Sequence, residues 1–222
     1  GILFLPDVIG IWQNSKLMAD QFAANGYVTL IIDTFNGDPL PLGPRPAGFN
    51  IHEWIAKGSD GKNPHTTEAV DPIVVEGIKY LREVHGVTKL GAVGYCFGAK
   101  VRLLVSSHLE TQLQQQYVVR HYKSGIQVGY VAHPSFVEED ELAAITGPFA
   151  ISAAETDTIF PAEKRHKSEE ILKAAGVPYQ INLFSGVEHG FAVRGDPNVK
   201  ISRFAREQAF LQAVTWFDNW LL

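Results

Sequence analysis

The chain has 222 residues, of which 45% are hydrophobic and 19% charged, a composition typical of a globular protein long enough to bury one continuous core. With 19 basic and 24 acidic residues the net charge is −5, which argues against the basic surface that nucleic-acid binding requires, so we expect no nucleic-acid partner. The longest apolar runs are strand-sized, and we expect no membrane-spanning helix.

The first residues, Gly-Ile-Leu-Phe-Leu-Pro, read as a strand that the chain enters directly. We therefore expect N-terminal strands of the fold to be missing from this sequence. No signal peptide or transit segment is visible. The single cysteine, Cys96, leaves no partner for an intrachain disulfide. Together these features favour a cytoplasmic protein.

Short apolar runs alternate with helical periodicity along most of the chain. Strands are predicted at residues 2–5, 28–32, 89–93, 128–132, 149–153 and 179–184. Helices are predicted at residues 14–24, 67–85, 161–175 and 202–222, the first with Asn14 or Ser15 as its N-cap. Parallel strands buried on both faces read as continuous apolar runs. The pattern therefore predicts a single α/β domain over residues 1–222, with a mostly parallel, doubly wound sheet flanked by helices.

Residues 36–65 interrupt this rhythm and contain five of the 12 prolines in the chain. Proline cannot extend a helix or a central strand, so a long loop is expected here. Such loops often cover active sites, and the aromatic residues Phe49 and Trp54 would suit that role. A surface excursion without a role is the alternative.

The short stretch Gly94-Tyr95-Cys96-Phe97-Gly98 follows a predicted strand and precedes a helical stretch. This is the context of a nucleophile elbow, in which small residues flank a nucleophile on a tight turn. The start of the following helix would favour a thiolate at Cys96. The alternative is a buried structural cysteine. The context favours a nucleophile.

A cysteine nucleophile needs a base, and the base needs an orienting acid. In this fold class the acid and then the histidine follow the nucleophile, in loops after later strands. Asp157 and His189 follow the predicted strands 149–153 and 179–184 in that order. Asp157 could instead cap the next helix, and Glu155 is a rival acid. His133 precedes Asp157, so we expect it to line a pocket or serve the structure.

Backbone N–H groups near the elbow would hold the oxyanion of an acyl-transfer reaction. Phe97 follows the nucleophile, and Val8 lies in the loop after the first strand. Asp7, beside Val8, is either a cap or an acid near the thiol. No histidine pair has metal-ligand spacing with carboxylates around it, so neither a metal nor a cofactor is expected. Aromatic candidates for the substrate pocket, each also a plausible core residue, are Trp12, Phe35, Trp54, Tyr130 and Phe191.

With these residues in place, the sequence resembles the dienelactone hydrolase family of α/β-hydrolases, and its fungal branch in particular. The resemblance covers nearly the whole chain and rests on the stretches "LPDVIGIWQNSKLMADQFAANGY", "VGYCFGAK", "GYVAHPSF", "AAETDTIFP" and "EHGFAVRGD". It implies the α/β-hydrolase fold and a Cys96–Asp157–His189 triad. In well-known members a glutamate at the position of Asp7 keeps the resting cysteine protonated, and arginines bind the lactone carboxylate. Here Asp7 is one methylene shorter, and Arg194 is the candidate arginine.

The chain departs from the family after the elbow, where "GAK" is expected to continue directly into "YVVRHYKSG". Residues 101–116 separate these two stretches. The segment begins with valine, whose codons start with GT, and ends with glutamine, one of whose codons is CAG. A retained intron in the gene model and a genuine insertion are the two hypotheses. Sequencing the transcript decides between them, because a spliced message that is continuous through 101–116 contradicts the intron.

The sequence therefore predicts a hydrolase that cleaves a small lactone or ester through a covalent acyl-enzyme on Cys96. A thioesterase or ester hydrolase of polyketide secondary metabolism is one alternative. A catalytically silent binding protein with the same fold is the other. The expected partner is a small-molecule substrate, and the expected assembly is a monomer or a homodimer.

Overall fold

The computed structural model describes residues 1–99, 122, 125–135 and 139–222. Its centre is a six-stranded sheet in the order β2-β1-β3-β4-β5-β6, and every neighbouring pair of strands is parallel. The strands are β1 (Ile2–Leu5), β2 (Thr29–Ile31), β3 (Gly91–Tyr95), β4 (Val128–Ala132), β5 (Phe149–Thr156) and β6 (Tyr179–Glu188). The predicted parallel α/β fold is confirmed.

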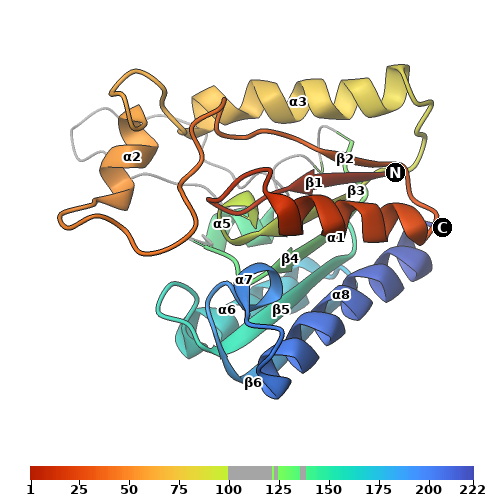
Figure 1. The fold of residues 1–222 in the computed structure, drawn as a ribbon. Coiled ribbons are helices and arrows are strands. Elements are labelled where there is room, and N and C mark those ends of the chain that lie inside the picture. The colour runs from red at the N-terminus through yellow and green to blue at the C-terminus, as the bar shows by residue number, and fades with distance from the viewer. Residues whose placement is uncertain (100–121, 123–124, 136–138) are drawn as a thin grey trace.

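Helices pack against both faces of this sheet. The helical elements of the described residues are α1 (Gln13–Ala24), α2 (Ile51–Lys57), α3 (Thr67–Glu83), the 3₁₀ turn η1 (Cys96–Ala99), α5 (Glu139–Ala143), α6 (Ala162–Ala175), α7 (Phe191–Arg194) and α8 (Lys200–Trp220). Figure 1 shows α1 and α8 on the near side of the sheet, while α2 stands apart, beyond one end of the strands. The two chain ends lie together at the opposite end.

The alternation of side chains along β1 explains why both faces need a cover. Leu3 and Leu5 belong to a core that includes apolar residues of α3 and α6. Ile2 and Phe4 point the other way, into a core built with α1 and α8. Successive side chains of a strand point to opposite faces. Because all four residues of β1 are apolar, the strand buries side chains in both cores.

The first helix differs from its prediction at the N-terminus. It begins at Gln13, its N-cap is Trp12, and no side chain caps it. The predicted caps bond elsewhere: Asn14 Nδ2 donates to the Val193 carbonyl at 2.6 Å, and Ser15 Oγ donates to the Gly10 carbonyl at 3.0 Å. The N-cap prediction was wrong because tertiary partners claim both polar side chains.

The segment 36–65, predicted from its prolines to be a long loop, contains the helix α2. Asn50 Oδ1 accepts hydrogen bonds from the His52 and Glu53 amides and so starts α2. Trp54 of this helix is buried against Phe35, with ring centroids 5.2 Å apart. The segment is therefore anchored in the core at the edge where the strands end.

Residues 101–116, the predicted insertion or retained intron, lie outside the described residues. Within the described part of the chain, none of the helices is both long enough and apolar enough to cross a membrane.

Candidate active site

Cys96 comes directly after β3, on a turn in which its backbone has a strained conformation. Its φ is +52°, a left-handed conformation that non-glycine residues adopt rarely. Two residues later, a Cβ on Gly98 would lie 2.2 Å from the Leu5 carbonyl oxygen of β1. Only glycine fits at such a distance, so the sequence Gly-x-Cys-x-Gly folds here as a tight elbow.

The other predicted residues follow other strands at the same edge of the sheet. Asp7 lies beyond β1, Asp157 directly follows β5, and His189 directly follows β6. In open parallel sheets, sites form outside the carboxyl ends of strands, beside the point where the strand order reverses. That point lies between β1 and β3. The topology thus gathers residues 7, 96, 157 and 189 from across the chain.

Cys96, His189 and Asp157 form one chain of hydrogen bonds. His189 Nε2 is 3.1 Å from Cys96 Sγ, and His189 Nδ1 is 2.8 Å from Asp157 Oδ2. The second carboxylate oxygen, Asp157 Oδ1, accepts the amides of Ile159 at 2.8 Å and Phe160 at 2.9 Å. Asp157 therefore fixes the turn after β5 and contacts the histidine, but it does not cap α6, whose N-terminus has no side-chain cap.

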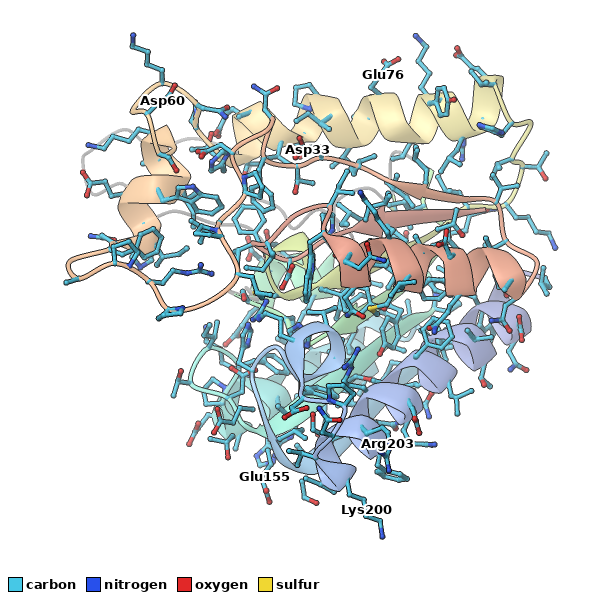
Figure 2. All side chains as sticks on the ribbon, viewed as in Figure 1. Asp33, Asp60, Glu76, Glu155, Lys200 and Arg203 are labelled. Carbon is cyan, nitrogen blue, oxygen red and sulfur yellow. The ribbon has the colours of Figure 1, made fainter. Side chains whose placement is uncertain are left out.

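The rival acid and the rival histidine occupy other places. Glu155 Oε2 accepts the Gly186 amide at 2.7 Å, and Figure 2 shows Glu155 at the periphery of the molecule near Lys200. His133 is fully buried, with its ring centroid 5.1 Å from that of His189. Burial, together with the positive charges of His189 and Arg194, holds the pKa of His133 well below its usual range. His133 therefore packs as a neutral ring behind the predicted base.

Electrostatics favour an ion pair between the cysteine and the histidine. Burial alone would raise the pKa of Cys96, but the charge and hydrogen bond of His189, with a contribution from Arg194, outweigh it and lower the pKa. Burial opposes protonation of His189, yet the neighbouring Cys96 and Asp157 raise its pKa to about 9. The two groups titrate together, and each stabilises the charged form of the other.

Asp7 forms an ion pair with Arg194 beside this site. Arg194 Nη1 donates to Asp7 Oδ2, and the Ile9 amide donates to Asp7 Oδ1 at 3.2 Å. Burial raises the pKa of Asp7, and the guanidinium of Arg194 partly offsets that rise. Arg194 keeps about a quarter of its side chain exposed. Arg194 therefore pairs with Asp7, interacts with Cys96 and remains partly accessible to solvent.

Of the predicted oxyanion and pocket residues, Val8, Phe97, Trp12, Phe35 and Trp54 lie in the core that contains Cys96 or pack against it, whereas Phe191 lies in the core on the other face of the sheet. Val8 follows Asp7 in the loop after β1, and Phe97 is the second residue of η1. Phe97 packs on Phe35 with ring centroids 5.0 Å apart. Trp12 is the N-cap of α1 and packs against the same core as Cys96. Trp54 stacks on Phe35 in that core, and Phe191 lies 5.6 Å from His133, centroid to centroid.

Tyr130 is placed away from the other predicted pocket residues. It is fully buried in the core beneath α8. Its hydroxyl lies 2.7 Å from Ser152 Oγ and 2.8 Å from the Ala209 carbonyl of α8. The structure gives Tyr130 the core role that was the alternative for every aromatic. It does not belong to the proposed pocket.

Two residues that the sequence reasoning missed reach the site. Ser135, after β4, has its Oγ 3.3 Å from Cys96 Sγ. Arg45, from the segment 36–65, lies close enough to interact electrostatically with Asp7, Cys96 and Arg194. Burial and the positive charge of Arg194 lower the pKa of Arg45. Neither residue has a local sequence signal, because only the fold brings them to the elbow.

No metal centre is formed by the side chains that the structure describes: no group of three or more His, Cys, Asp or Glu residues there could hold an ion.

Comparison with known proteins supports the family that the motifs resemble. The chain is 48% identical over 225 residues to Hydrolase tropI of Talaromyces stipitatus, covering 100% of this chain and 82% of that protein. It is 34% identical over 227 residues to Dienlactone hydrolase 1 of Gibberella moniliformis, covering 99% of this chain and 78% of that protein.

A solved structure, described as a putative dienelactone hydrolase from Klebsiella pneumoniae, matches the fold with a TM-score of 0.69 at 12% identity. The match covers 99% of this chain and 86% of that one. The model of the dienelactone hydrolase family matches residues 1–221. The chain belongs to the dienelactone hydrolase family and is an α/β-hydrolase.

Proposed function

We propose that this hydrolase cleaves small lactones or esters through a thioester formed on Cys96. The observation that carries the proposal is the continuous hydrogen-bonded chain from Cys96 Sγ through His189 to Asp157. Nucleophile, base and orienting acid stand in the order and at the distances that covalent acyl transfer needs.

In the first half-reaction the Cys96 thiolate attacks the carbonyl carbon. A sulfur–carbon bond forms, and the carbonyl π pair moves onto the oxygen. The N–H groups of Val8 and Phe97 are the proposed donors to that oxyanion. The tetrahedral species collapses and expels the alkoxide, which takes the proton from His189 Nε2.

In the second half-reaction His189 is neutral and its Nε2 accepts a proton from the attacking water. The hydroxide forms a bond to the thioester carbon, and collapse expels the Cys96 thiolate with the bonding pair. The acid product leaves, and the imidazolium again faces the thiolate. Asp157 keeps the imidazole ring oriented in both halves through Nδ1.

Two guanidiniums beside the thiol support a substrate that carries an anionic group. Arg194 is paired with Asp7 and partly exposed, and Arg45 of the segment 36–65 lies within electrostatic range of Arg194, Asp7 and Cys96. Guanidinium groups bind carboxylates in bidentate geometry. We therefore propose an ester or lactone with a carboxylate near the scissile bond, and we propose that the segment 36–65 covers it.

The proposal is tested with a panel of small aryl esters, lactones and thioesters, each with and without a carboxylate. Cys96→Ser and His189→Ala should each lower kcat/KM by at least about 10³-fold. Turnover that survives both changes contradicts the triad. A preference for thioesters would favour the thioesterase alternative. No turnover together with an unreactive Cys96 would favour a silent binding protein.

A direct readout is a covalent adduct at Cys96. Mass spectrometry after rapid acid quench should find the acyl group of a slowly turned-over ester on the peptide that contains Cys96. A His189→Ala variant should accumulate less of it, because its thiol lacks the imidazolium that lowers its pKa.

A further inference from the structure

The turn after β4 places a serine hydroxyl against the reacting atoms of the site. Ser135 Oγ is 3.3 Å from Cys96 Sγ and 3.4 Å from His189 Nε2. The Ser135 amide also donates to the Cys96 carbonyl at 3.2 Å, which ties this turn to the elbow. Ser135 is almost completely buried. Ser135 is therefore held against the elbow through both its backbone amide and its side-chain hydroxyl.

Backbone strain accompanies this contact on both sides. Of the described residues, three that are not glycine have a positive φ, and two of them are Cys96 at +52° and His133 at +38°. The left-handed turn at His133 directs the chain back toward the elbow after β4. The His133 amide is anchored to the Ser152 carbonyl of β5 at 2.8 Å. Strain of this kind persists where the surroundings enforce it, and it concentrates at functional sites.

We propose that Ser135 is a further catalytic residue, whose hydroxyl donates a hydrogen bond to the Cys96 thiolate. The inference rests on the proposed function of Cys96 as a nucleophile. A thiolate only accepts hydrogen bonds, and the donors that face it include the imidazolium N–H of His189, the guanidinium of Arg194 and the hydroxyl of Ser135. No bond is broken and no proton is transferred in this arrangement.

The hydroxyl would act differently in the two halves of the reaction. Before attack it stabilises the negative charge on sulfur, which raises the fraction of thiolate but lowers its intrinsic reactivity. Once the thioester forms, sulfur carries no charge and this hydrogen bond weakens. The hydroxyl then lies beside the neutral Nε2 of His189.

The test measures the rate of Cys96 alkylation by iodoacetamide as a function of pH. Ser135→Ala should raise the apparent pKa of the Cys96–His189 pair by about one to two units, as loss of a hydrogen bond to a charged group implies. For a shift of one unit the plateau at high pH should rise about threefold, because a more basic thiolate is a better nucleophile. Ser135→Thr keeps the hydroxyl and should restore the wild-type profile.

Ser168→Ala is the matched control, because Ser168 is almost equally buried and its hydroxyl donates to the Lys164 carbonyl within α6. It should leave the alkylation profile unchanged. If Ser135→Ala does not fold, Ser135→Gly is the second variant, which removes the hydroxyl together with Cβ. A folded Ala or Gly variant with the wild-type pKa and plateau overturns the inference.

The alkylation profile does not depend on turnover, so the two proposals fail separately. Full hydrolytic activity in Cys96→Ser overturns the proposed function. An unchanged alkylation profile in Ser135→Ala, with hydrolysis abolished in Cys96→Ser, overturns only the role of Ser135.

Discussion

Asp157 makes two sets of contacts that two substitutions can separate. In Asp157→Asn the side-chain oxygen can still accept the Ile159 and Phe160 amides. The new NH₂ group faces His189 Nδ1 and can only donate to it. The imidazolium therefore loses the carboxylate partner that now lies 2.8 Å away.

The size of the effect follows from that one hydrogen bond. A hydrogen bond to a charged group contributes about 1.5–3 kcal/mol, which corresponds to about one to two pKa units. We expect the pKa of His189 in Asp157→Asn to fall from about 9 to about 7–8. The protonated ring donates to the leaving group, so activity is lost as pH rises through that pKa. The upper limb of the kcat/KM profile should move down accordingly, and kcat/KM itself should fall about 10²–10⁴-fold.

Asp157→Ala serves as the companion variant. It removes the carboxylate from His189 as well as the acceptor of both amides. We expect the same loss of activity, and a free energy of unfolding about 1–3 kcal/mol below that of the Asn variant, measured by urea denaturation. If Asp157→Asn keeps its upper limb near pH 9 and its kcat/KM within threefold of wild type, Asp157 only caps its turn and the reasoning is refuted.

Three further substitutions test other parts of the site. Gly98→Ala should destabilise the fold by about 1–3 kcal/mol in urea denaturation and lower kcat/KM, because the new methyl group would overlap the Leu5 carbonyl; a wild-type midpoint would contradict the elbow geometry. Arg194→Gln should raise the pKa of Cys96 in the alkylation profile, since the guanidinium lowers it now, and should raise KM more for carboxylate-bearing esters than for neutral ones. Tyr130→Phe should lower the unfolding free energy by about 1–2 kcal/mol through the lost hydrogen bonds of its hydroxyl, with kcat/KM unchanged; a large loss of activity would return it to the pocket.

The strands could be predicted because they are short apolar runs, of which β1, β3 and β4 are buried along their whole length. All six appear within a few residues of their expected positions. The end of β3 was placed two residues early, at position 93, because glycine closes the apolar run there. In the structure Gly94 and Tyr95 continue the strand by pairing with Val131 and Ala132 of β4. Strand pairing, which the local pattern does not contain, sets that boundary.

The helix α2 and the two missed site residues show a different limit. The prolines around α2 outweighed the local cap at Asn50 in the sequence interpretation. Ser135 contacts Cys96, and Arg45 comes within electrostatic range of it, only because separate strand ends and a long segment converge on one edge of the sheet. Asp157 and His189 could be found because their order along the chain is a property of the fold class, whereas Ser135 and Arg45 follow no such order.

The positions of Cys96, His189 and Arg194 in the sequence also set the order in which these residues are synthesised. Cys96 leaves the ribosome early, whereas His189 and Arg194, which lower its pKa, come nearly a hundred residues later. Until β6 pairs with β5, Cys96 has neither partner, and its thiol has no neighbouring positive charge from them to lower its pKa. A growing chain that has not yet reached His189 therefore lacks both residues that lower the pKa of Cys96. In the function proposed here, Cys96 is activated only once the sheet is complete.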